Sequence, residues 1–197
     1  MIITHERRKL INAVLFFALR TKKCGITKLF KLLYFLDFEH YKTTGRSITG
    51  LNYNAWPKGP VPVPLFEELH NDKLEADLRE KIEVEERPLP NNKKFLKINP
   101  VGGLDLNVFT KRELRIMEAL AVEYENADAD AMVEETHLET LPWHQVYEVE
   151  KRKQQLIPYE YAVRKDEAEF IQFIKKENDE FLSNYSNVVN DSWNDLI

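Results

Sequence analysis

The chain has few of the residues that redox and metal chemistry in proteins depends on. Its 197 residues include one cysteine, Cys24, and five scattered histidines. A single cysteine cannot form an internal disulfide, and a zinc site needs three or four Cys, His or acidic ligands at suitable spacing. The sequence therefore predicts no disulfide and no metal centre.

Long apolar runs and nucleotide-binding loops are missing as well. No stretch approaches the roughly 18 apolar residues of a membrane-spanning helix. No cleavable leader is evident, because charged residues at 6–9 precede the first apolar stretch. Gly102-Gly103 lacks the Lys and Ser/Thr of a phosphate loop, and no Gly-x-Ser-x-Gly elbow occurs. We expect a cytoplasmic protein without a membrane span, a cofactor or enzymatic activity.

The charge is uneven along the chain. The net charge is -5, yet the first 46 residues carry ten Lys and Arg against three Asp and Glu. A nucleic-acid surface, a docking face for an acidic protein and a merely solvated face are all compatible with this excess. A solvated face is the most common of the three, so we favour it.

Length and composition indicate one domain. A chain of 197 residues with 43% apolar content can build a single core. We expect a domain over residues 1–182 and a frayed polar tail over residues 183–197, which is rich in Asn, Ser and Asp.

The first half of the chain predicts three helices and a hairpin. A helix is expected over residues 5–22, with Gly25 as its C-cap, and another from Ile26 to Tyr41 that is apolar on nearly every face. A tight proline turn follows, and then a third helix begins at Pro64. It continues through Leu65, Phe66 and Leu69, with Leu74 and Leu78 as candidates for its extension. Alternation at 82–86 and 95–98 predicts an antiparallel hairpin.

The second half predicts further helices. Thr110 and Glu113 form a capping box, which places a helix start at 110, and Asp128 is a candidate N-cap for a short helix toward His137. A last helix is expected over residues 166–182. The fold class is therefore α+β, a helix-dominated single domain with a small antiparallel hairpin.

Two sequence features carry the functional interpretation. The first is the pattern Lys-Leu-x-Lys-Leu-Leu-Tyr-Phe at 28–35, followed by Thr44-Gly45. The second is Ala-Trp-Pro-x-Gly-Pro-Val at 55–61, with a later His-Leu-Glu-Thr-Leu-Pro-Trp at 137–143. Proline and glycine fix one shape for the loop at 56–64 and hold its aromatic in place.

Over roughly residues 5–145, this combination resembles the Panacea domain, the antitoxin domain of SocA-like proteins. The resemblance implies a cognate protein toxin that the chain binds and neutralises by direct contact. It also leaves open an adaptor role, in which the toxin is handed to a protease. A DNA-binding autoregulator is a further alternative, disfavoured by the acidic balance and the lack of a helix-turn-helix. The candidate partner-binding or motif residues are Lys28, Lys31, Tyr34, Asp37, His40, Trp56, Lys58, Gly59, Pro60, Val61, His137 and Trp143.

Structural roles compete with binding roles at several of these positions. A tryptophan held by prolines can anchor a partner or pin a loop onto its own domain, and we favour core packing for Trp56 and Trp143. Asp37 and His40 lie one turn apart, and an internal hydrogen bond to the loop at 44–59 is the simplest expectation. His137 is expected to cap a helix or pack under Trp143.

Overall fold

The computed structural model describes most of the chain. The described residues are 4–70, 74–90, 94–138, 140–163, 167, 169, 170, 172–174 and 176. The helix expected over 166–182 lies largely outside the described residues. The tail expected over 183–197 lies wholly outside them.

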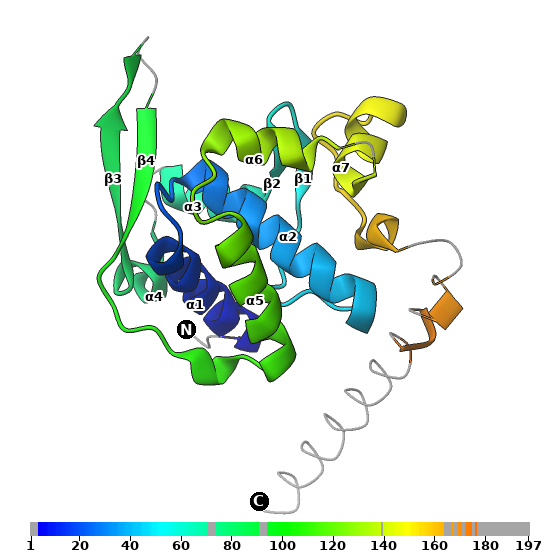
Figure 1. Cartoon of the computed structure of the whole chain (residues 1–197), viewed down its shortest axis with the longest axis horizontal. Coiled ribbons are helices and arrows are strands. Elements are labelled where there is room, and N and C mark those ends of the chain that lie inside the picture. The colour runs from blue at the N-terminus through cyan, green and yellow to red at the C-terminus, as the bar shows by residue number, and fades with distance from the viewer. Residues whose placement is uncertain are drawn as a thin grey trace, which may run out of the picture.

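Helix α2 (Ile26–Thr44) is the centre of the molecule (Figure 1). It is buried over most of its surface, as its apolar pattern predicts, and its neighbours include α1 (His5–Arg20), α5 (Lys111–Glu123) and α6 (Ala129–Thr136). The apolar core is continuous from α1 through α2 to α5 and α6. The polar side chains that are buried on α2 must therefore find their partners inside the protein.

The expected C-cap at Gly25 is wrong. Helix α1 ends with Thr21 as its C-cap, and Gly25 is the N-cap of α2. A side chain at 25 would place its Cβ 2.3 Å from Phe95 Cε2, so the close approach of strand β4 (Lys94–Pro100) favours glycine. The left-handed cap glycine is Gly45, with φ 66°, at the end of α2.

Two antiparallel strand pairs flank α2, on different sides (Figure 1). The expected hairpin is confirmed as β3 (Ile82–Pro88) and β4 (Lys94–Pro100). The proline turn is itself a second small hairpin, β1 (Asn54–Trp56) and β2 (Gly59–Val61), which the sequence did not predict as strands. Backbone bonds from Ala55 to Gln154 and Gln155, at 2.7 and 2.8 Å, tie β1 to a distant segment. Long-range pairing of this kind leaves no local sequence signal.

The third helix does not extend to Leu74 and Leu78, the two candidates for its continuation. Helix α3 spans Val63–His70, and α4 (Ala76–Arg79) is separate from it. Leu78 is buried, but it packs into the core from α4 and not from α3.

The C-terminal half follows its capping signals. The capping box of Thr110 and Glu113 starts α5, and the Asp128 side chain accepts a hydrogen bond from Ala131 N at the start of α6. Three further short elements are η2 (Leu106–Val108), α7 (Pro142–His144) and η4 (Tyr159–Ala162), and a π-helical turn, η3 (Gln145–Val149), follows α7.

The result is the helix-dominated α+β fold that the sequence predicts. Of the helices in the described part of the chain, none has the length and apolar character to cross a membrane.

Candidate functional site

The C-terminal end of α2 holds a buried carboxylate. Asp37 Oδ1 accepts hydrogen bonds from Ile48 N at 2.7 Å and Thr49 N at 2.8 Å, while Oδ2 accepts from Tyr53 Oη at 2.8 Å and from Thr49 Oγ1. Burial raises the pKa of Asp37, and these donors oppose that rise. The expected hydrogen bond to the loop at 44–59 is confirmed, and Asp37 fixes the path of that loop.

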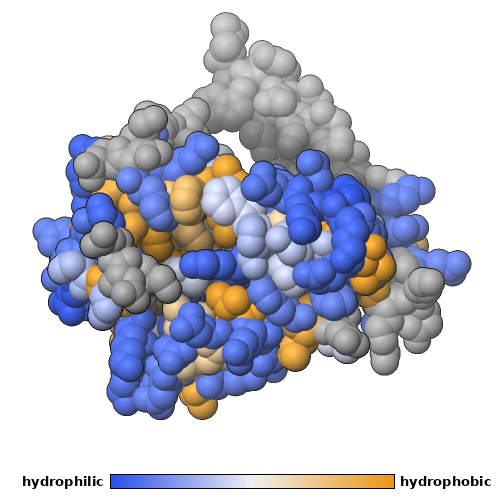
Figure 2. Space-filling model, turned by 90° about the horizontal axis from the view of Figure 1, so that it is seen from above, coloured by the Kyte–Doolittle hydropathy of each residue, from blue (hydrophilic) through white to orange (hydrophobic). Residues whose placement is uncertain are grey.

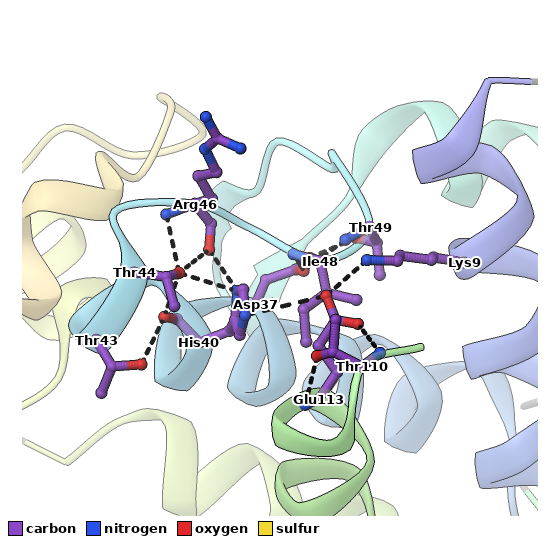
Figure 3. A network of polar contacts seen from close by, with 10 residues as sticks. All are labelled: Lys9, Asp37, His40, Thr43, Thr44, Arg46, Ile48, Thr49, Thr110 and Glu113. Carbon is purple, nitrogen blue, oxygen red and sulfur yellow. Dashed lines mark hydrogen bonds and ion pairs between the residues drawn. The ribbon is translucent and has the colours of Figure 1, made fainter. Parts of the chain in front are cut away.

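His40 links the same loop to α5 (Figure 3). Its Nδ1 donates to Arg46 O at 2.8 Å, and its Nε2 lies 4.0 Å from Glu113 Oε1. Glu113 in turn accepts from Lys9 Nζ at 2.6 Å and from Thr110 N at 2.7 Å. Burial lowers the pKa of His40, which favours the neutral ring. This cluster ties α1, α2 and α5 together.

Two lysines lie inside the N-terminal half of α2. Lys28 Nζ donates to three carbonyl oxygens, those of Lys22 at 3.0 Å, Glu125 at 3.2 Å and Ala127 at 2.8 Å. Lys31 Nζ donates to Pro60 O at 2.8 Å. Both side chains are fully buried, and desolvation lowers the pKa of Lys31 to about 7. Through these hydrogen bonds the two lysines hold loops of the backbone in place.

The motif at 137–143 holds the β1–β2 hairpin against the rest of the domain. Trp143 Nε1 donates to Trp56 O at 2.9 Å, and the His137 ring stacks on Trp143 at 3.7 Å between centroids. Gly59 has φ 94°, and a Cβ there would lie 2.6 Å from Thr136 Oγ1. The prediction that His137 packs against Trp143 is confirmed, as is the core role of Trp143, which is 2% exposed.

The remaining motif residues divide between interior and surface. Tyr34, Pro60 and Val61 are buried, and the Tyr34 ring packs in a tilted arrangement against Phe38, at 4.3 Å between ring centroids. Lys58 is exposed, and Trp56 is half-buried, so Trp56 is neither a full core residue nor a free anchor. What the motif presents at the surface is the hairpin tip at Trp56, Pro57 and Lys58.

A pocket of about 350 Å³ opens beside this tip. We call it the Trp56 pocket. Trp56 and Phe66 pack at 5.1 Å between centroids, and His70 stacks on Phe66 at 3.8 Å, so three rings form a wall. The lining residues are Ile26, Thr27, Phe30, Lys31, Trp56, Pro57, Lys58, Val61, Phe66 and His70.

Sequence reasoning missed Phe66 and His70 as site residues. They lie one turn apart on α3, so helical spacing alone could have paired them. Nothing local indicated that the pair would meet Trp56, because that contact depends on how α3 leaves the hairpin.

Metal-ligating side chains do not gather in the described residues. No group of three or more His, Cys, Asp or Glu in this part of the chain is placed to hold a metal ion. A preformed apolar pocket with a few polar groups beside a rigid loop is instead a common form of binding site.

The chain belongs to the SocA-like antitoxin family. The family model for "Antitoxin SocA-like, Panacea domain" matches residues 29–144, which include α2 from Leu29 onward, both hairpins, α5, α6 and α7. The comparisons with curated proteins and with solved structures found no match. Membership supports a role in a toxin–antitoxin system, implies a toxin as partner and suggests a non-enzymatic function.

Proposed function

We propose that this protein is an antitoxin that binds a cognate protein toxin and neutralises it by direct contact. The family supports the toxin–antitoxin role. The observation that carries the contact mechanism is the Trp56 pocket, which is already formed beside a hairpin held by Lys31 and Trp143. An ordered surface loses little conformational entropy on binding, so its contacts contribute more fully to affinity.

We further propose that residues 1–182 act as one domain and that the protein works in the cytoplasm. The continuous core supports the first point, since it joins α1 to elements as late as Ile157. Blockade by contact needs no chemical step, which agrees with the non-enzymatic role that the family suggests.

The DNA-binding alternative gains little from the basic N-terminal region. Arg7 pairs with Glu68 and Asp77, each at 2.7 Å, and Lys9 pairs with Glu113. Further ion pairs hold Arg20, Lys22 and Lys42, and Lys28 and Lys31 are buried. Phosphate binding requires cations that can reach the nucleic acid backbone. Most of the local basic side chains are therefore either paired with carboxylates or buried.

Co-expression with the protein encoded by the neighbouring reading frame tests the proposal. We expect growth rescue together with a stable complex that survives purification and buries about 1,200 to 2,000 Å². Toxin abundance, measured by immunoblot, should stay unchanged under blockade. Rescue with falling toxin abundance that depends on a cellular protease would support the adaptor mechanism, and rescue without any complex would refute direct contact.

A further inference from the structure

The Trp56 pocket combines an aromatic wall with positive charge at its edge. Lys58 is exposed on the hairpin tip, His70 is exposed on α3, and none of the described lining residues carries a carboxylate. The whole chain is acidic, with a net charge of -5. This opening is therefore a local basic region on an acidic protein, and it complements a partner group of opposite sign.

The buried amine behind the hairpin reinforces this preference. Lys31 lines the pocket, and in the described residues its ammonium has one hydrogen-bond acceptor, the carbonyl of Pro60. Desolvation, with no compensating carboxylate, lowers the pKa of Lys31 to about 7. A negative charge placed nearby would stabilise the protonated amine, and through a low-dielectric interior that interaction is only weakly screened.

A second pocket adjoins the Trp56 pocket. It has a volume of about 460 Å³, shares Ile26, Thr27 and His70 with the first and reaches Phe95 and Leu96 of β4. Seen from above, the apolar surface is broken into patches among hydrophilic side chains, and a broad one lies in the half that holds the β3–β4 hairpin (Figure 2). A bound chain segment could therefore extend from the Trp56 pocket toward β4.

We propose that the Trp56 pocket receives a bulky apolar side chain from an exposed segment of the toxin, and that a carboxylate beside that side chain pairs with Lys58. This inference rests on the proposed function and names the chemistry of the partner. An aromatic or leucine side chain inserted among Trp56, Phe66 and Phe30 would be desolvated at the centre of the contact, where interface hot spots form. The charge pair at the rim would guide encounter and orientation.

Selection of peptides tests this chemistry without knowledge of the toxin. A phage-displayed library of random linear peptides is selected on the purified full chain, and the enriched sequences are synthesised. We expect a bulky apolar residue with Asp or Glu within a few positions. Replacing that acid by its amide should weaken binding about tenfold. Enrichment without an acidic residue, or no enrichment at all, would overturn the proposal.

Two variants locate the binding. Thr27→Trp fills the pocket from its half-buried rim position and should weaken peptide binding at least about tenfold, while Val122→Trp adds the same ring at an exposed position on α5 as a control. Lys58→Glu should weaken the binding of acidic peptides about tenfold. Lys111→Glu, at an exposed position on α5, is its control. Circular dichroism melts confirm that each variant folds. If Thr27→Trp and the parent protein bound the peptides equally well, the Trp56 pocket would not be the binding site.

The co-expressed toxin separates this inference from the proposed function. If the parent protein co-purifies with the toxin and folded Thr27→Trp co-purifies equally well, the pocket assignment fails and direct neutralisation stands. If the parent protein rescues growth without co-purifying, direct neutralisation fails, whatever the peptides show. Loss of co-purification in Thr27→Trp and its retention in Val122→Trp would support both.

Discussion

Two buried charges on helix α2, Asp37 and Lys31, differ in how fully they are hydrogen-bonded. At the C-terminal end, Asp37 is surrounded by donors from Ile48, Thr49 and Tyr53. Toward the N-terminal end, the Lys31 ammonium bonds to one carbonyl, that of Pro60. A buried ion with a full set of hydrogen bonds fixes structure, whereas one with few bonds stores unfavourable desolvation energy.

This difference assigns different tasks to the two ends. The Asp37 end shapes the loop that leads into β1, and the residues of that loop that bond to Asp37, Ile48, Thr49 and Tyr53, are buried. The Lys31 end lies under the hairpin whose tip borders an open pocket. We infer that the first end is scaffold and that the second is where a partner completes the electrostatics.

The largest expected effect comes from removing the fully bonded charge. Asp37→Ala should lower the free energy of unfolding by about 3 to 5 kcal/mol, because it leaves several buried donors without an acceptor. Glu39→Ala is the matched control, since Glu39 lies two residues away on the exposed side and pairs with Lys42 at the surface. Urea denaturation measures both. If the two variants lost similar stability, Asp37 would not be the scaffold of this end.

The next effect concerns the hairpin above Lys31. Gly59→Val should cost about 2 to 4 kcal/mol, because φ 94° is strained for valine and its Cβ would meet Thr136 Oγ1 at 2.6 Å and Lys31 Nζ at 2.8 Å. Gly103→Val is the control, since a Cβ at Gly103 meets nothing within 4 Å. Thermal unfolding of the pair compares them. Equal melting temperatures would mean that the hairpin is not a rigid platform.

The sequence predicted the scaffold end better than the exposed end. Apolar residues on every face of 26–41 indicate a buried central helix, and a buried Asp37 must then find donors, of which the following loop is the nearest source. Thr110 and Glu113 likewise mark a helix start through local hydrogen bonds. All of these signals depend on near neighbours in the chain.

The pocket could not be predicted in the same way. Trp56 meets Phe66 only because α3 folds back over the hairpin, and Trp143 reaches Trp56 O across 87 positions of sequence. Gly25 was misassigned because its reason for being glycine is Phe95, on a strand that follows much later. Contacts at long sequence separation leave no periodicity to read.

A pH series sharpens the electrostatic contrast. The pKa of Lys31 is about 7 in the folded protein against 10.5 for an ordinary lysine, so between these values the unfolded chain binds a proton that the native state does not. The free energy of unfolding should therefore rise with pH across this window. Below pH 7 both states bind the proton, so Lys31 no longer makes the free energy of unfolding depend on pH. Relative to Lys31→Met, the parent protein should gain up to about 1.4 kcal/mol per pH unit.

Denaturant unfolding at several pH values between 7 and 10 measures this slope, and Lys58→Met, at an exposed position of the same hairpin, is the matched control. A stability difference between the parent protein and Lys31→Met that stays constant with pH would show that the Lys31 amine is not desolvated as the structure indicates.

The smallest effect is expected on the outer face of α1, which belongs to neither end of α2. Arg8 is exposed, so Arg8→Glu should change the free energy of unfolding by no more than about 0.5 kcal/mol. Arg7→Ala, by contrast, should cost about 1 to 3 kcal/mol, because it removes the partner of two largely buried carboxylates, Glu68 and Asp77. Arg8→Glu also tests whether basic charge on α1 has a binding partner. Arg8 does not line the Trp56 pocket, so the toxin association rate measured by surface plasmon resonance should be nearly the same for Arg8→Glu, whereas Lys58→Glu should slow it. A gel shift on promoter DNA should show no salt-sensitive complex for either the parent protein or Arg8→Glu. A clear complex that Arg8→Glu weakens for all sequences alike would identify α1 as a phosphate-binding face and restore the autoregulator alternative.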